Sequence, residues 1–507
     1  MWTIVILAVL FLLLVVAAYD LLQRNHAILR NFPIVGHFRY LFELVGPELR
    51  QYIVTGDNEE RPFSRDQRRW VYASSKKQNN YFGFGTDNDL ELSPNYLIIK
   101  HSAFPIMDDI PGESTPGHLY PLPCAKVLGG SRGREKAFRP ASVINISGMS
   151  YGSLSAAAIE ALNCGSAICE CLHNTGEGGV SPYHLKGGEL VWQIGTGYFG
   201  CRNPQGGIDR DKFLETCASG PVRAIEIKLS QGAKPGLGGL LPASKVTGEI
   251  SRIRGVPHGK ACYSPPGHTA FNDVDSMLDF VEDLATETGL PVGIKSAVGE
   301  ISFWRELVHL MATTERGVDF ITIDGGEGGT GAAPLAFSDH VALPFKIALS
   351  RVYREFAQRD MQQDVVFIGS GKLGFPETAM LGFSLGCDMV NVGREAMMAI
   401  GCIQAQRCHT GHCPTGVATQ SAWLMRGLDP THKAHRLANY VLTLRKELTY
   451  LSRACGVRHP ALVVPDHFEI LDDRFGSRNA QDVFGYEESW SLPAAEDQDV
   501  INEIMEG

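Results

Sequence analysis

The chain has 507 residues, of which 44% are hydrophobic and 20% charged, so it can bury a large core in one big domain or two ordinary ones. Its formal net charge of −10 excludes the basic surface that nucleic-acid-binding proteins present. Twelve cysteines are too sparse for a disulfide scaffold, and fifty-five glycines gather in loops without a period, which indicates ligand-binding loops.

The first segment is apolar. Eighteen residues from Trp2 to Tyr19 carry no charge, which is close to the roughly 20 residues that cross a bilayer. A cleaved signal peptide is the alternative, because Ala17 and Ala18 resemble a cleavage site, although no positive residue precedes the run. Basic residues follow it, at Arg24, Arg30 and Arg39. We predict an anchor over residues 1–24, and the positive-inside rule places the chain after it on the cytoplasmic side. Cysteines that act as metal ligands need a reducing compartment, which also favours a cytoplasmic catalytic part.

Residues 25–119 are predicted to connect this anchor to the main domain. Apolar and polar residues alternate over 32–45, which is typical of an amphipathic helix on a membrane surface and equally of a lid on the main domain. The basic run over 61–70 suits anionic headgroups or a solvated face.

From residue 142 the chain alternates short β-branched runs with helical patterns, which predicts βα units around a parallel sheet. The strand runs are SVINIS, RAIEIKLS, PVGIKSAV, DFITID, DVVFIGS and DMVNVG. Two of the helices have clear ends: Asp273 caps one that stops at Gly289, and Asp429 caps one that stops near Gly456.

A doubly wound sheet and a closed (β/α)8 TIM barrel both fit this alternation. Glycines end two late strands, in GSGKL (369–373) and NVGRE (391–395). They favour the barrel, where phosphate sites recur after the seventh and eighth strands. We predict the barrel over residues 120–456, followed by an acidic tail over 457–507.

The run Gly369–Gly374 matches the dinucleotide pattern G-x-G-x-x-G, but we reject that interpretation. Asp388 is too close to be the ribose-binding acid, which is expected about 20 residues further on. A phosphate loop of a barrel explains Gly369 and Gly371 without it.

Three cysteines, Cys402, Cys408 and Cys413, form a C-x5-C-x4-C pattern among glycines. Thiolates are soft ligands for zinc, copper(I) or iron–sulfur clusters, and three without a fourth fit a three-iron cluster or an incomplete zinc site. The spacing differs from the CxxC pairs of zinc ribbons. Buried structural thiols are the alternative.

Two glycine-rich stretches are candidate ligand loops. Gly328, Gly329 and Thr330 offer backbone amides and a hydroxyl to a phosphate or ring, unless they form a plain surface loop. Lys228 and Lys234 flank Gln231, and two cations with an amide suit a dicarboxylate or an imine.

The segment CIQAQRCHTGHCPTGVATQ resembles the 3Fe–4S signature of the FMN-binding synthase domain of glutamate synthases. ISGMSYGSLS, NTGEGG, IEIKLSQGAKPGLGG, SPPGH, DGGEGGTGAAP and GSGKLG follow the family's order between residues 120 and 455. The resemblance implies a TIM barrel that binds FMN and a 3Fe–4S cluster held by the three cysteines.

The resemblance also implies roles for single residues. Lys228, Lys234 and Glu177 are the expected catalytic residues, Glu177 lying in the family's mobile loop. Gln231, Lys234 and Arg254 are expected to bind substrate. Lys295 stands at a strand end, where a cation stabilises a reduced flavin. The expected cofactor-binding set is Met149, Ser150, Tyr151, Gln193, Lys228, Lys295, Gly328, Gly329, Thr330, Gly369, Gly371, Gly393 and Arg394.

The implied activity is that of a glutamate synthase-like oxidoreductase of the CH–NH2 class. It would aminate 2-oxoglutarate reductively, through 2-iminoglutarate, to L-glutamate. Nothing before residue 120 resembles the family's glutaminase domain, so ammonia is expected from solution or a partner. Electrons are expected from a ferredoxin, a reductase subunit or a membrane carrier.

Leu237 and Leu240 stand where the family usually has Glu and Gln, which removes hydrogen bonds that specificity depends on. The same cofactors acting on another substrate or on membrane quinone, or a membrane-tethered electron-transfer protein, are therefore alternatives.

Overall fold

The computed structural model describes residues 2–506 apart from 24, 57–58, 87 and 91–92. The chain divides into two compact units, residues 1–68 and 69–507.

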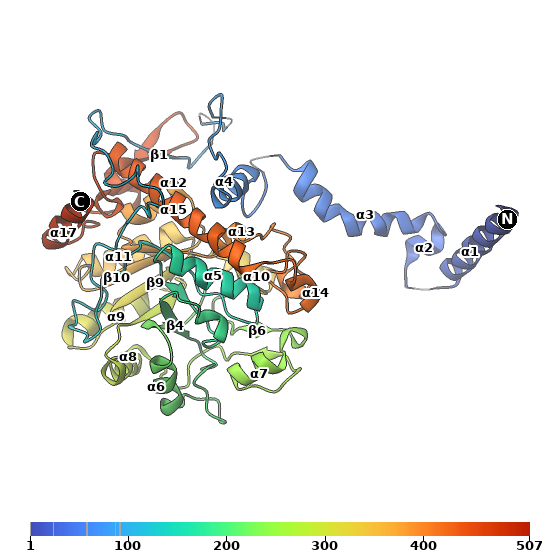
Figure 1. Ribbon diagram of the computed structural model, residues 1–507, viewed down its shortest axis with the longest axis horizontal. Coiled ribbons are helices and arrows are strands. Elements are labelled where there is room, and N and C mark those ends of the chain that lie inside the picture. The colour runs from blue at the N-terminus through green and yellow to red at the C-terminus, as the bar shows by residue number, and fades with distance from the viewer. Residues whose placement is uncertain (1, 24, 57–58, 87, 91–92, 507) are drawn as a thin grey trace. The chain divides into compact units, whose positions relative to one another are not determined.

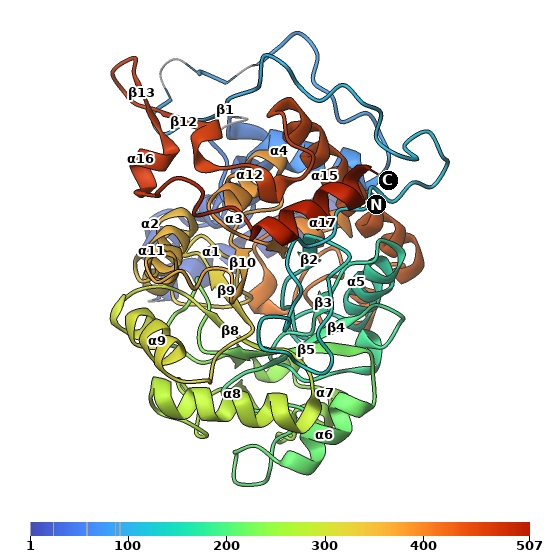
Figure 2. The ribbon, with the colours of Figure 1, turned by 90° about the vertical axis from the view of Figure 1, so that its left-hand side faces the viewer.

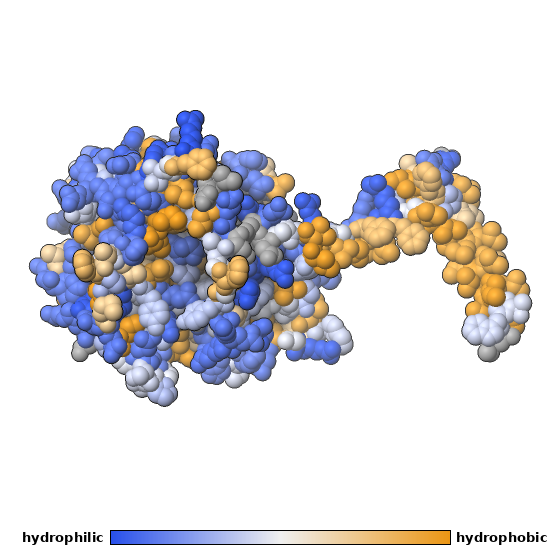
Figure 3. All heavy atoms as spheres, turned by 90° about the horizontal axis from the view of Figure 1, so that it is seen from above, coloured by the Kyte–Doolittle hydropathy of each residue, from blue (hydrophilic) through white to orange (hydrophobic). Residues whose placement is uncertain are grey.

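The first unit is helical. Its helices are α1 (Trp2–Leu22), α2 (Ala27–Asn31) and α3 (Gly36–Leu49), followed by a π-helical turn at Arg50–Val54. The side chains of α1 are exposed and apolar, as the orange spheres of Figure 3 show for this unit. Asp20 is the exception, because its carboxylate accepts a hydrogen bond from the Ile34 amide at 2.9 Å and lies 3.0 Å from His37 Nε2.

Within the described part of the chain, α1 alone is long and apolar enough to cross a membrane, with a mean hydropathy of 2.9. A signal sequence meets the same two criteria. Arg24, part of the predicted basic flank, lies outside the described residues.

The second unit contains a closed barrel of eight parallel strands, so the predicted (β/α)8 fold is confirmed. The strands follow one another around the barrel in chain order, and β11 closes it by pairing with β2, Val390 opposite Ile144. They are β2 (Ile144–Ile146), β3 (His173–Asn174), β4 (Leu190–Ile194), β5 (Val222–Lys228), β8 (Val292–Ser296), β9 (Phe320–Asp324), β10 (Val366–Ser370) and β11 (Met389–Val392).

Helices surround this barrel in Figures 1 and 2. The main ones are α5 (Ala156–Ile168), α6 (Arg210–Ala218), α8 (Val274–Thr288), α9 (Ser302–Thr313), α11 (Phe345–Ala357), α12 (Pro376–Ser384), α13 (Arg394–Ala399) and α15 (Pro430–Ala454). The predicted caps are confirmed, because Asp273 accepts the Ser276 amide at 2.8 Å and Asp429 accepts the Thr431 amide at 3.0 Å. Gly289 ends α8 in the left-handed conformation, with φ of 71°.

Two barrel strands and one insertion were not predicted. The strand β3 has two polar residues and so no hydrophobic run. The strand β4, LVWQI, is an apolar run that the predicted alternation does not include. The β5-to-β8 connection carries a hairpin of β6 (Leu240–Leu241) and β7 (Cys262–Tyr263) and the helix α7 (Gly248–Arg254).

The remaining elements lie outside the barrel. Strand β12 (Phe468–Leu471) pairs with β1 (Leu97–Ile99) and β13 (Ser477–Asn479), so part of the acidic segment 457–507 forms a small sheet. The short helices are α4 (Arg65–Ser75), α10 (Leu335–His340), α14 (Ala422–Met425) and α16 (Ala480–Phe484), and α17 (Ala495–Glu506) closes the chain.

Candidate active site

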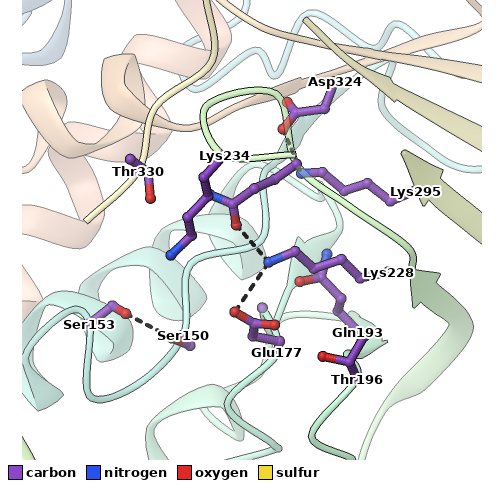
Figure 4. A network of polar contacts seen from close by, with 12 residues as sticks. Ser150, Ser153, Glu177, Gln193, Thr196, Lys228, Lys234, Lys295, Asp324 and Thr330 are labelled. Atoms are coloured by element: carbon purple, nitrogen blue, oxygen red, sulfur yellow. Dashed lines mark hydrogen bonds and ion pairs between the residues drawn. The ribbon is translucent and has the colours of Figure 1, made fainter. Parts of the chain in front are cut away.

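Two lysines lie at the carboxyl ends of neighbouring strands, where TIM-barrel enzymes place their ligand-binding groups. Lys228 ends β5 and pairs in register with Lys295 of β8. Their side chains are only 12% and 7% exposed. Lys228 Nζ lies 3.2 Å from Glu177 Oε1 and donates to Gln231 Oε1 at 2.6 Å (Figure 4).

Glu177 is the carboxylate at the centre of these cations. Burial raises the pKa of its carboxyl, but Lys228, with Lys234 and Arg254, acts in the opposite direction and holds the pKa below its usual value. The residue therefore stays ionised at neutral pH and can accept hydrogen bonds from a cationic or N–H-bearing ligand.

Lys234 lies in the loop after β5 and is buried, with Nζ donating to the Ala332 carbonyl at 3.1 Å. Burial lowers its pKa, the neighbouring charge of Lys228 lowers it further, and Glu177 partly opposes both effects. An ammonium group held in this way gains from any anion that enters, because the anion restores the charge balance.

Asp324 connects two of the loops around the mouth. Its Oδ2 atom lies 3.8 Å from Lys295 Nζ and accepts the Gly232 amide at 2.8 Å. We call Glu177, Lys228, Lys234, Arg254, Lys295 and Asp324 the mouth cluster.

Arg254, the last residue of α7, is 4% exposed. Its Nη2 atom donates to Ser150 Oγ at 3.2 Å and to the Tyr151 carbonyl at 3.0 Å. Its Nε atom is buried without a hydrogen-bond partner among the described atoms. The expected substrate arginine and the expected flavin loop at Met149–Tyr151 are therefore brought together.

The glycine loops also approach one another closely. A Cβ atom at Gly329 would lie 2.7 Å from Arg394 Cδ, so only glycine leaves room for this arginine. Arg394 follows Gly393 after β11 and donates to the Glu327 carbonyl. Gly371, after β10, has φ of +125°, which L side chains rarely adopt.

The other members of the expected cofactor set lie on the same strands and loops. Gly369 is within β10, where a Cβ atom would meet packed side chains at 2.6 Å, and Gly328 follows β9. Thr330 Oγ1 lies 3.5 Å from the Ala332 carbonyl. Gln193 is buried on β4.

A half-buried histidine, His268, contacts the backbone beneath the mouth cluster. His268 Nε2 lies 3.0 Å from the Lys228 carbonyl, and Nδ1 lies 3.1 Å from the Tyr198 hydroxyl. Because a carbonyl only accepts, Nε2 carries the proton. Burial lowers the pKa of His268 to about 4, so the ring is neutral at pH 7. His268 belongs to the SPPGH motif, which on its own predicts no role for this residue.

The three cysteines share the loop after α13. The Cys402 carbonyl accepts from Tyr72, and Cys402 Sγ accepts the Gln404 amide at 3.4 Å. Burial, together with the charges of Cys408 and Cys413, raises the pKa of the Cys402 thiol to about 12, against the effect of the hydrogen bond from the Gln404 amide. Cys413 differs, because hydrogen bonds from Thr415, Val417 and Ala418 outweigh its burial and hold its pKa below the usual value.

Lys245 joins this loop to the barrel mouth. Its buried Nζ atom donates to the Cys408 carbonyl at 2.9 Å and to the Ser153 carbonyl at 3.1 Å. Burial lowers the pKa of Lys245, and Cys408 and Cys413 oppose that shift. No motif of the sequence marks Lys245.

Three thiols within electrostatic range of one another, one of them with a pKa held below its usual value, match the donor chemistry of an iron–sulfur cluster. Over the described residues, however, no group of three or more His, Cys, Asp or Glu side chains is placed to hold a metal ion. The loop therefore has the ligand types without the converged geometry.

Comparison with known proteins identifies the family of this chain. A family model described as a conserved region in glutamate synthase matches residues 128–458. A glutamate synthase large subunit-like protein, YerD of Bacillus subtilis, is 37% identical over 88% of this chain and 90% of its own length. The chain belongs to the glutamate synthase family.

Other relatives match over a shorter part of both chains. An archaeal glutamate synthase (NADPH) of Methanocaldococcus jannaschii is 36% identical over 62% of this chain and 59% of its own length. Among solved structures, a mutant flavocytochrome b2 with pyruvate bound matches with a TM-score of 0.45 and 14% identity, over 93% of this chain and 94% of that chain. The barrel assignment itself comes from the strand pairing.

Within this family the chain carries leucine at two positions of the loop after β5. Leu237 and Leu240 are 39% and 40% exposed, and Leu240 pairs with Tyr263, which is 69% exposed. Gly239, between them, has no room for a side chain, because a Cβ atom there would lie 2.5 Å from Glu177 Oε1. This loop thus presents apolar side chains next to the mouth cluster.

Proposed function

We propose that this chain is an FMN- and iron–sulfur-dependent oxidoreductase that converts 2-oxoglutarate and ammonia, through 2-iminoglutarate, to L-glutamate. Membership of the glutamate synthase family supports the oxidoreductase class. The observation that carries the specific reaction is the charge of the mouth cluster, in which four cations accompany two carboxylates. An anionic substrate supplies the missing negative charge.

The chain's residues fit FMN, because the loops after β9, β10 and β11 offer glycine amides and Arg394 to a phosphate. Lys228 and Lys295 would face the ring. When bound, FMN supplies hydride transfer and a 3Fe–4S cluster supplies single-electron transfer. Cys402, Cys408 and Cys413 would hold the cluster.

Three residues of the mouth cluster then have distinct tasks. Lys234, with Gln231, binds a carboxylate of the 2-oxo acid, and Arg254 binds the other, with its unpartnered Nε atom available to it. Ionised Glu177 accepts hydrogen bonds from ammonium or from the imine N–H. Buried donors aimed at a developing charge are worth more than donors in water.

The partners follow from the same proposal. Ammonia comes from solution or another protein, and an external donor, whether a ferredoxin, a reductase subunit or a membrane carrier, supplies electrons. The helix α1 anchors the chain with the catalytic unit on the cytoplasmic side.

The proposal is tested with the full chain, purified anaerobically in detergent. Absorbance and EPR report FMN and a three-iron signal, after which the protein is reduced and mixed with 2-oxoglutarate and ammonium. We expect flavin reoxidation and one glutamate for each two electrons from ammonium alone. Glutamine without ammonium serves as the control. A loaded protein that 2-oxoglutarate does not reoxidise would contradict the proposed substrate.

A second candidate is the same chemistry on a more apolar substrate or on membrane quinone. The exposed Leu237 and Leu240 beside the mouth favour it. Reoxidation by a water-soluble quinone or an apolar 2-oxo acid, with none by 2-oxoglutarate, would select this candidate.

A further inference from the structure

The interior of the barrel, beneath the mouth cluster, contains a carboxylate to which the proposed activity assigns no role. We call this interior layer the floor. Glu226 lies on β5 two residues before Lys228, so both side chains project from the same face of the strand. It is 1% exposed. A buried carboxylate requires compensation by hydrogen bonds or by a cation.

Three neutral side chains from three other strands provide that compensation. Oε1 accepts the amide groups of Asn174 at 2.8 Å and Gln193 at 2.5 Å, and Oε2 accepts the Thr322 hydroxyl at 2.6 Å. Every bond is donated to Glu226, which is the pattern of an ionised carboxylate.

The two amides are oriented as a consequence. Each has its NH2 group and its carbonyl oxygen on opposite branches of one carbon, so donating to Glu226 turns the carbonyl oxygen away from the floor. For Asn174 the result is visible, because its Oδ1 atom accepts the Gly176 amide at 3.0 Å. Gly176 has φ of +65° and begins the turn that carries Glu177.

The space around this network is filled. The cavity lined by Glu226, Asn145, Asn174 and Asn391 measures about 10 Å³, at the lower limit for one water molecule. A ligand can therefore approach this network only from the mouth.

We infer that Glu226 is a positioning residue that fixes the Gln193 amide so that its carbonyl oxygen accepts an N–H of the bound ring, and fixes the Asn174 amide so that it holds the Glu177 turn. This inference rests on the proposed function. A flavin ring carries one N–H in its oxidised form, so an inverted Gln193 amide would present a donor to a donor.

The test compares FMN binding by the apoprotein of wild type and of the Glu226→Gln variant. A glutamine at 226 is neutral, so the hydrogen bonds that its carbonyl oxygen can still accept from the two amides lose the strength that a carboxylate charge gives them, and Gln193 inverts more readily. We expect the dissociation constant for FMN to rise by about tenfold, the effect of one hydrogen bond, and the visible absorption bands of the bound flavin to shift.

A double-mutant cycle separates positioning from a general loss of structure. In a Gln193→Ala background, Glu226→Gln should change the FMN dissociation constant by less than about twofold, because its effect passes through Gln193. Asp388→Asn is the matched control, since it alters a buried carboxylate paired with Lys126 at the other end of the barrel. It should lower apoprotein stability and leave FMN binding unchanged.

Equal FMN binding and equal flavin spectra in wild type and Glu226→Gln would overturn the inference, as would full additivity in the cycle. If Glu226→Gln does not fold, Glu226→Asp, which withdraws the carboxylate by one methylene, should weaken FMN binding in the same direction. A wild-type chain that binds no FMN would instead refute the proposed function itself.

Discussion

The two ends of the barrel hold their buried charges in different ways. At the bottom, Lys126 lies 3.2 Å from Asp388 and donates to two backbone carbonyls, and Arg134 pairs with both Glu282 and Asp319. At the mouth, four cations accompany two carboxylates. The cations at the bottom are matched by carboxylates, whereas those at the mouth outnumber them. The same residue types thus stabilise the fold at one end and leave an excess of positive charge, suited to an anion, at the other.

The bottom also holds a cavity, and the charges around it are balanced. A cavity of about 370 Å³ opens at the bottom, beside Lys126, Gly130, Asp364 and Asp497. Its cations are already paired, since Lys126 pairs with Asp388 and the nearby Arg139 lies 3.4 Å from Asp497. Charge balance is therefore a better guide than cavity size to the candidate active site, because a ligand binds where it lowers the electrostatic energy.

The largest effect is expected at the cysteine loop. Cys413→Ser removes the sulfur whose pKa is held below its usual value by the hydrogen bonds from Thr415, Val417 and Ala418. Turnover with an external donor should fall by about 100-fold or more, with loss of the three-iron EPR signal and retention of FMN. Cys455→Ser, at the end of α15, is the control. Unchanged EPR in Cys413→Ser would refute this ligand assignment.

Next in size is Lys234→Met, which tests the claim that the mouth is incomplete. We expect kcat/KM for the 2-oxo acid to fall by about 10²–10³-fold, as when a buried donor to a developing charge is removed. Apoprotein stability should hold or rise, because burial already disfavours this ammonium group. Kinetics and thermal unfolding measure the two effects. Lys212→Met, on the exposed face of α6, is the control. A large fall in apoprotein stability would mean that Lys234 stabilises the fold, as the paired cations at the bottom do, and would contradict an incomplete charge balance at the mouth.

The converse change is Asp319→Asn at the bottom. It leaves Arg134 with one of its two carboxylates and weakens the bond that Asp319 Oδ2 accepts from the Val292 amide at 2.7 Å. The free energy of unfolding should fall by about 3–5 kcal/mol, the range for breaking a buried pair. Denaturant titration measures it. FMN binding per folded molecule should not change, and a weaker binding would mean that the two ends are coupled.

The smallest effect concerns pH and occurs at both ends. Burial lowers the pKa of His459 to about 3 and that of His268 to about 4. Below about pH 6.5 the unfolded chain takes up protons that the folded chain excludes, so stability falls as the pH drops, by about 1.4 kcal/mol per pH unit for each histidine. Unfolding of the apoprotein between pH 6.5 and 4.5 measures the slope of the unfolding free energy against pH. His459→Gln should reduce the number of protons taken up on unfolding by one. An unchanged slope would contradict a neutral buried His459.

The sequence predicted those parts of the molecule that depend on local signals. Runs such as Phe-Ile-Thr-Ile in β9 and caps such as Asp273 can be recognised from a few consecutive residues. The strand β3 cannot be recognised in this way, because its two residues, His and Asn, form a strand only by pairing with β2 and β4.

The same distinction applies to the site. Lys228 and Lys295 could be placed because each ends a recognisable strand. The roles of Glu226 and Asp324 depend on partners from other strands, and that of Lys245 on the chain's return more than 150 residues later. Such partners are set by barrel closure, and no local pattern encodes them.

One helix links the regions that the proposed chemistry needs. The helix α15 packs along α5, starts just after the cysteine loop, and its Tyr440 hydroxyl donates to the Gly374 carbonyl in the loop after β10. Glu447, further along, accepts from Trp70 and Asn80. Fraying of α15 would therefore release both cofactor loops together. Amide hydrogen exchange in these loops should follow the exchange of α15, so that cofactor retention and global unfolding form one cooperative event.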